Sequence, residues 1–242
     1  MEGNLSGISK DNNLSCNDSS YKSHSITYQE EVDISQNDEV REFKIILIGS
    51  VSVGKTSIFN KFINGDFSEN CKSTINIEFK TKYLKMDNNV FVKLTLWDTC
   101  GAEIYRAVTK QYYKRANAII LIFDLTDQKS FIDLENIWLK DIKNCGDNNL
   151  QILIVGNKLD LIDQRKVTES EAINFCKEKG YKYIEASAKE GTNVLKIFEE
   201  LSFDLAKQYE KQKEEETNSR VVMDFDDKNI ITTKNNKKTG CC

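Results

Sequence analysis

The most specific chemistry in the sequence lies in residues 49–56, which fit the pattern G-x-x-x-x-G-K-[ST]. In such a loop, backbone N–H groups turn inward around a phosphate, and glycines permit that turn. The Lys55 ammonium supplies a charge for the terminal phosphates, and the Thr56 hydroxyl is a ligand for Mg²⁺. The expected phosphate contacts come from Gly49, Ser50, Val51, Ser52, Val53, Gly54, Lys55, Thr56 and Ser57.

A second polar segment, residues 157–160, directly follows an apolar run at residues 150–155. The Asp160 carboxylate can accept hydrogen bonds from guanine N1–H and from its 2-amino group. Adenine offers no such pair, so a carboxylate facing adenine would remain unpaired, which argues against an ATPase or nucleotide kinase. Asn157 can brace the neighbouring loops, and the aliphatic part of Lys158 can lie over the base.

A third segment, Ser187-Ala188-Lys189, follows the last apolar strand pattern, and its Ala188 N–H can meet guanine O6. Each of these short motifs, taken alone, also occurs as an ordinary polar loop. Their order along the chain, each after its own strand, indicates that together they bind a guanine nucleotide.

The elements that must hold these motifs alternate along the chain. Apolar runs predict strands at residues 43–48, 78–86, 90–97, 118–123, 150–155 and 181–186, with a hairpin turn at 87–89. Helical spacing predicts helices at residues 56–63, 131–142, 169–179 and 194–209, with Gly180 as a C-terminal cap. This alternation predicts an α/β fold with a mostly parallel six-stranded sheet and helices on both faces. Ligands of such sheets bind at the carboxyl ends of the strands.

Composition sets the limits of this domain. The chain has 242 residues, and we expect one domain at residues 41–207 between a disordered N-terminal extension, 1–40, and a flexible tail, 208–242. The net charge of −4 gives no support for nucleic-acid binding. No apolar run approaches the roughly 20 residues that a spanning helix needs, and no signal region begins the chain, so we expect a cytosolic protein. His24, the only histidine, lies in the polar extension, which argues against Ser-His or Cys-His catalysis.

From about residue 42 to residue 207 the chain resembles the Ras superfamily of small GTPases, of the P-loop NTPase class, and most closely its Rab branch. The Rab-like segments are residues 75–79, 93–99 and 112–114 and the terminal Gly240-Cys241-Cys242. The resemblance implies a GTP/GDP switch in vesicle and membrane trafficking, with Mg²⁺ bound beside the nucleotide. Thr74 would ligate Mg²⁺ and sense the γ-phosphate, Asp98 would hold Mg²⁺ through water, and the Gly101 N–H would bond the γ-phosphate. Phe67 would stack edge-on against guanine, although a loop aromatic can equally pack on the core.

The catalytic positions implied by the resemblance are Lys55, Gly101 and position 102, where the family's water-orienting glutamine is replaced by Ala102. Val51 would crowd the γ-phosphate, and Ser52 replaces a usual glycine, which is costly if φ is positive there. We expect slow intrinsic GTP hydrolysis. The alternative is a hydrolysis-deficient, GTP-bound membrane landmark that acts as a binding module.

Cys241 and Cys242 end the chain and resemble the dual geranylgeranylation site of Rab proteins. The resemblance implies a monomer on the cytoplasmic face of an intracellular membrane that cycles with the cytosol. The implied partners are exchange factors, GTPase-activating proteins, effectors, a GDP dissociation inhibitor and a Rab escort protein. The organelle and the transport step do not follow from the sequence.

Overall fold

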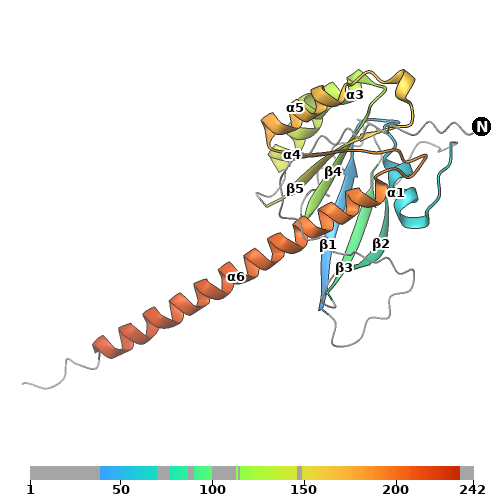
Figure 1. The fold of residues 1–242 in the computed structure, drawn as a ribbon. Coiled ribbons are helices and arrows are strands. Elements are labelled where there is room, and N and C mark those ends of the chain that lie inside the picture. Colours follow the sequence, from blue (N-terminus) through green and yellow to red (C-terminus); the bar gives the residue numbers. More distant parts are fainter. Residues whose placement is uncertain are drawn as a thin grey trace, which may run out of the picture.

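The computed structural model describes residues 39–69, 77–86, 90–99, 113, 115–145 and 149–234. Its sheet has six strands in the order β2-β3-β1-β4-β5-β6 (Figure 1). The strands are β1 Glu39–Ile48, β2 Glu78–Lys85, β3 Val90–Asp98, β4 Ala118–Asp124, β5 Gln151–Asn157 and β6 Lys182–Glu185. Neighbouring strands pair in parallel except β2 with β3. The predicted six-stranded, mostly parallel α/β sheet is therefore confirmed.

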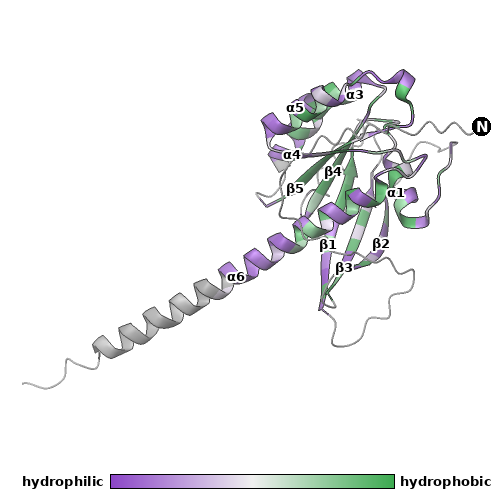
Figure 2. Ribbon diagram, viewed as in Figure 1, coloured by the Kyte–Doolittle hydropathy of each residue, from purple (hydrophilic) through white to green (hydrophobic). Residues whose placement is uncertain are grey.

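Helices cover both faces of the sheet. They are α1 Lys55–Asn64, α3 Gln128–Asp133, the π-helical turn η3 Leu134–Leu139, α4 Lys140–Cys145, the short 3₁₀ turn η4 Ile162–Gln164, α5 Glu169–Lys179 and α6 Val194–Lys234. Side chains alternate along β1: Ile45 and Leu47 pack with α1 and α6, whereas Ile46 and Ile48 pack with α3, η3 and α5. Because both faces are covered, the central strands are apolar along most of their length (Figure 2).

The parallel arrangement brings the polar strand ends to one edge. Leu47, next to the last residue of β1, is in register with Asp98 at the end of β3. Asp124 at the end of β4 is in register with Asn157 at the end of β5. The segments that the sequence marked as binding motifs therefore converge at the carboxyl edge of the sheet, where ligands of such folds bind.

Helix α5 has the bounds that the sequence predicts. Its N-cap, Thr168, accepts a hydrogen bond from the Glu171 N–H at 3.2 Å, and Gly180 closes the C-terminus with φ 74°. These signals are local, since capping residues act on the adjacent turn, and so they could be recognised without tertiary information.

The helix predicted at residues 131–142 differs from the structure. In its place α3 ends at Asp133, the π-helical turn η3 follows, and α4 continues from Lys140. Leu134, Trp138 and Leu139 are buried within this π turn. Apolar spacing alone does not separate an α-helix from one carrying a π turn, because the wider turn is fixed by what its side chains contact.

The start of the first strand and the end of the last helix also differ from the prediction. Strand β1 begins at Glu39, inside the extension predicted to be disordered, and α6 continues to Lys234 where the helix was predicted to end at residue 209 and a flexible tail to begin at 208. No glycine or proline lies between residues 194 and 234, so nothing in the sequence terminates the helix. Figure 1 shows the later turns of α6 leaving the sheet. The predicted hairpin turn at 87–89 and residues 1–38 and 235–242 lie outside the described residues.

Candidate functional site

The phosphate loop is the connection between β1 and α1, with Lys55, Thr56 and Ser57 in the first turn of α1. Gly49 has φ +147°, and a Cβ added there would lie 2.1 Å from the Ile122 carbonyl oxygen. Gly54 has φ +95°, and its added Cβ would lie 2.2 Å from Asn157 Nδ2. Only glycine fits either position, so the two glycines of the motif are required by close packing as well as by backbone conformation.

The residues between those glycines depart from the usual pattern. Ser52 has φ 63°, so a non-glycine residue occupies the left-handed region, which is costly for any residue with a Cβ. Val51 is 53% exposed, whereas Val53 is buried. The Val51 side chain therefore stands on the open side of the loop.

Lys55 lies inside the loop and is buried. Its Nζ donates hydrogen bonds to the carbonyl oxygens of Gly49 at 3.0 Å and Ser50 at 2.8 Å. These two bonds hold the ammonium against the loop backbone, which is where a phosphate-binding cation must lie.

A buried pair fits the predicted magnesium site. Thr56 Oγ1 donates a 2.6 Å hydrogen bond to Asp98 Oδ2, and Asp98 is only 1% exposed. Among the described residues, the second carboxylate oxygen, Asp98 Oδ1, is buried without a hydrogen-bond partner. Burial raises the pKa of Asp98 to about 6, although the Thr56 hydrogen bond and the Lys55 charge lower it. A hydroxyl and a partnerless buried carboxylate oxygen are the hard oxygen donors that Mg²⁺ prefers, so these residues fit the ion.

Asn157 joins the phosphate loop to the segment at residues 187–189. Its Nδ2 donates to the Val53 carbonyl oxygen at 2.9 Å, and its Oδ1 accepts from the Ala188 N–H at 3.1 Å. The bracing role that the sequence suggested for Asn157 is therefore seen in the geometry. The Ala188 N–H, which was expected to meet guanine O6, is bonded to Asn157 in this structure.

The other base-side residues lie around the same point. Ser187 Oγ donates a 2.6 Å hydrogen bond to Asp160 Oδ1, which ties the third segment to the second. The Lys158 ammonium pairs with Asp124 Oδ2 at 2.6 Å, and Lys158 has φ 69°. Asp124 was not singled out from the sequence, although it ends a buried strand at the same edge as Asn157, a signal that could have identified it.

Phe67 is half-buried and packs against the core that α1 and α6 share. This contact is compatible with the packing alternative, and stacking of Phe67 against guanine stays a prediction. Nearby, Lys189 forms an exposed 2.9 Å ion pair with Glu69, so the predicted base-side lysine contacts the loop that carries Phe67. An exposed pair of this kind adds little stability.

Several expected functional residues cannot be compared with the structure. Thr74, Gly101, Ala102, Cys241 and Cys242 lie outside the described residues.

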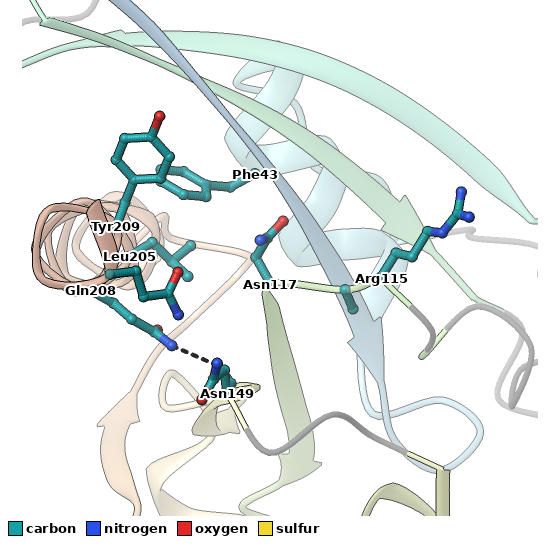
Figure 3. A pocket seen from close by; sticks show the side chains of 9 residues that line it. Phe43, Arg115, Asn117, Asn149, Leu205, Gln208 and Tyr209 are labelled. Atoms are coloured by element: carbon teal, nitrogen blue, oxygen red, sulfur yellow. Dashed lines mark hydrogen bonds between the residues drawn. The ribbon is translucent and has the colours of Figure 1, made fainter. Parts of the chain in front are cut away.

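A cavity of about 440 Å³ lies elsewhere in the fold (Figure 3). Its walls come from Phe43 of β1, from the residues just before β4 and β5, and from α6, including Asn117, Asn149 and Tyr209. These residues sit near the amino ends of β4 and β5, so the cavity is distinct from the binding motifs at the carboxyl edge. No described helix is both long and apolar enough to cross a membrane.

Comparison with known proteins gives the family to which the chain is similar. The model of the Ras family matches residues 44–207. The Ras-related protein YPTC6 of Chlamydomonas reinhardtii is 36% identical over 206 residues, which cover 83% of this chain and 94% of that protein. The Ras-related protein Rab-1 of Theileria annulata is 42% identical over 156 residues, covering 64% and 70%. The Ras-related protein Rab11A of Lotus japonicus is 42% identical over 156 residues, covering 64% and 68%.

Proposed function

Because the chain belongs to the Rab family of small GTPases, we propose that its carboxyl-edge site binds GTP and GDP with Mg²⁺ and hydrolyses GTP slowly. Ras-family members are generally GTP hydrolases, and the Rab relatives imply a switch in vesicle trafficking. The observation that carries the site assignment is the double hydrogen bond of Asn157, which joins the phosphate loop to the base-side segment. One nucleotide can contact the phosphate loop and the base-side segment together only if these two segments are held at a fixed distance and orientation.

On the phosphate side, the inward-facing loop and the buried Lys55 ammonium bind the β- and γ-phosphates. Lys55 is already oriented by the carbonyl oxygens of Gly49 and Ser50, so little side-chain freedom remains to be lost on binding. The Gly101 N–H adds a γ-phosphate contact.

Thr56, Thr74 and Asp98 (through water) hold Mg²⁺. When bound, the ion neutralises charge that develops on the phosphate oxygens. The Thr56 hydrogen bond orients the Asp98 carboxylate. The buried Oδ1, which has no hydrogen-bond partner among the described residues, would accept a hydrogen bond from a water held by the ion.

On the base side, Asp160 accepts the guanine N1–H and 2-amino protons. Ser187 Oγ donates to Asp160 Oδ1 and so fixes the carboxylate plane. The Ala188 N–H donates a hydrogen bond to guanine O6. To do so, this N–H must share or give up its present hydrogen bond to Asn157 Oδ1. The stem of Lys158 flanks the base, and the half-buried ring of Phe67 would present its exposed part to it.

Slow hydrolysis follows from two positions near the attacking water. Ala102 has no group that can hydrogen-bond water, and the exposed Val51 side chain of the loop would crowd the γ-phosphate. Val51 also supports the second candidate function, a GTP-loaded membrane landmark that hardly turns over.

An aromatic surface patch on β2 and β3 is a candidate contact for proteins that recognise the nucleotide-bound state. Phe79 is 59% exposed, and its ring stacks on Trp97 with centroids 5.0 Å apart. Exposed aromatic residues are typical anchors of protein interfaces. We assign this surface to effectors, exchange factors, GTPase-activating proteins and the GDP dissociation inhibitor. Geranylgeranyl groups added to Cys241 and Cys242 with the Rab escort protein anchor the monomer to a membrane.

Purified full-length protein tests the proposal. Nucleotide extracted from it should be GTP or GDP, and ATP should not compete at equal concentration. Mostly GTP, with single-turnover hydrolysis slower than that of an Ala102→Gln variant, supports slow turnover. A chain that retains no guanine nucleotide in the presence of Mg²⁺ overturns the assignment.

A further inference from the structure

The π-helical turn η3 packs against the phosphate loop. In a π turn the hydrogen bonds run from residue i to residue i+5, so side chains five apart come to the same side. Asp133, the N-cap of η3, and Trp138 within it are separated by this interval, and both contact Ser50. In an ordinary α-helix these two side chains would point in different directions.

The contacts use both hydrogen-bonding roles of one hydroxyl. Trp138 Nε1 donates to Ser50 Oγ at 3.3 Å, and Ser50 Oγ donates to Asp133 Oδ2 at 3.2 Å. Trp138 is only 3% exposed, so its indole N–H needs a partner inside the protein. A hydroxyl has one proton to donate, and the two contacts together fix its orientation.

The same residue contacts Lys55 through its backbone. The Ser50 carbonyl oxygen accepts a 2.8 Å hydrogen bond from Lys55 Nζ. Ser50 is therefore held from outside by η3 and holds the phosphate-binding ammonium on its inner side. A shift of the Ser50 backbone would move the carbonyl that orients Lys55.

We propose that Asp133 and Trp138 are positioning residues for nucleotide binding, acting through Ser50 on the phosphate loop and Lys55. The inference rests on the proposed guanine-nucleotide site and adds a connection from that site to η3. Neither Asp133 nor Trp138 belongs to the segments assigned to the nucleotide; both act through Ser50. Their effect is to hold the loop in its binding conformation, so their loss accelerates nucleotide release.

The same connection makes Trp138 a spectroscopic reporter. The chain has two tryptophans, Trp97 and Trp138. The part of the emission change on nucleotide release that disappears in Trp138→Phe therefore belongs to Trp138. We expect this part to disappear also in Ser50→Ala, because the indole then loses its partner in the loop.

The test measures how fast a fluorescent GDP analogue dissociates from full-length wild-type protein and from its variants. Ser50→Ala and Trp138→Phe should each accelerate release by about three- to tenfold, the effect of losing one hydrogen bond. The double variant should be little faster than either single variant, because both remove the same link. Ser50→Thr, which keeps the hydroxyl, should restore slow release.

Ser202→Ala is the matched control. Its hydroxyl is buried and donates a hydrogen bond to the Phe198 carbonyl oxygen in α6, away from the loop. Suppose that Ser50→Ala binds nucleotide and releases it as slowly as the wild type and Ser202→Ala do. That result would overturn the positioning role but leave the proposed function intact. Absence of nucleotide binding by the wild type instead overturns the proposed function.

Discussion

Thr56 Oγ1 donates a 2.6 Å hydrogen bond to Asp98 Oδ2, across the gap between the start of α1 and the end of β3. The contact uses one carboxylate oxygen and leaves the other, Oδ1, without a partner among the described residues. A buried carboxylate in this state destabilises the fold when it is charged and no cation is bound.

The free energy of unfolding of the metal-free protein should therefore depend on the ionisation of Asp98. Burial raises its pKa from 3.8 to about 6, so the folded protein holds a proton that the unfolded chain releases between these values. The free energy of unfolding should fall as the pH rises through that interval, by at most roughly 3 kcal/mol. Asp98→Asn cannot carry the charge and should lack this loss. Urea unfolding of both proteins, stripped of metal and nucleotide, measures the difference.

The control for that measurement is the ion itself. At pH 7, Mg²⁺ should stabilise the wild type and should not stabilise Asp98→Asn. If the two proteins show parallel pH profiles, the Asp98 carboxylate is not the group responsible.

Gly54→Ala should prevent correct assembly of the phosphate loop. Its Cβ would lie 2.2 Å from Asn157 Nδ2 at φ +95°, so either the loop or Asn157 must move. We expect a lower melting temperature and loss of nucleotide binding. Gly65→Ala is the matched comparison, since φ is +77° and nothing lies within 4 Å of the added Cβ. It should cost only about 1–2 kcal/mol, the strain of a left-handed alanine, and retain nucleotide.

Asn157→Ala should weaken both the fold and nucleotide binding. The change leaves the Val53 carbonyl and the Ala188 N–H without their side-chain partner, at about 1–3 kcal/mol for each buried group. Nucleotide affinity, measured by titration, should fall about tenfold or more. Gln208→Ala removes an exposed side-chain hydrogen bond to the Asn149 carbonyl oxygen, near the amino ends of β4 and β5, and should leave affinity unchanged.

Ala102→Gln should raise single-turnover GTP hydrolysis by about tenfold or more, because an amide can orient the attacking water. Val51→Gly should add to this effect by removing the branched side chain beside the γ-phosphate. Ser52→Gly serves as the control: it should relieve the φ 63° strain, by about 1 kcal/mol, without increasing the rate of the chemical step. Equal rates in all variants would show that neither Ala102 nor Val51 limits hydrolysis.

Arg41→Ala should loosen α6. The Arg41 side chain is 9% exposed, pairs with Glu210, and places its guanidinium carbon 5.3 Å from the Tyr209 ring centroid. Removing it should cost about 1–3 kcal/mol and increase hydrogen exchange in α6 near residue 209.

The matched control for α6 is Lys211→Ala. Lys211 is 78% exposed and forms only a 3.8 Å pair with Glu215 one turn further along the helix. Its loss should change stability by less than about 0.5 kcal/mol. Similar hydrogen exchange in both variants would mean that Arg41 does not hold α6 to β1.

The amino-acid sequence by itself determined the features whose causes are local. The apolar runs specified the strands, Thr168 and Gly180 bounded α5, and the two glycines around the loop specified its turn. The order of the strand-end motifs predicted a guanine-nucleotide site, and the matching family supports that prediction. These signals act within a few residues, through backbone conformation and periodic burial.

Tertiary structure decided what depends on contacts between distant segments. The two hydrogen bonds of Asn157 and the partnerless oxygen of Asp98 arise where strand ends meet. The π turn brings Asp133 and Trp138 together on Ser50, in the loop that follows β1. No residue's own propensity encodes such a meeting, since the partners lie far apart along the chain. Burial at that shared edge is also what raises the Asp98 pKa, an effect that the residue type alone could not indicate.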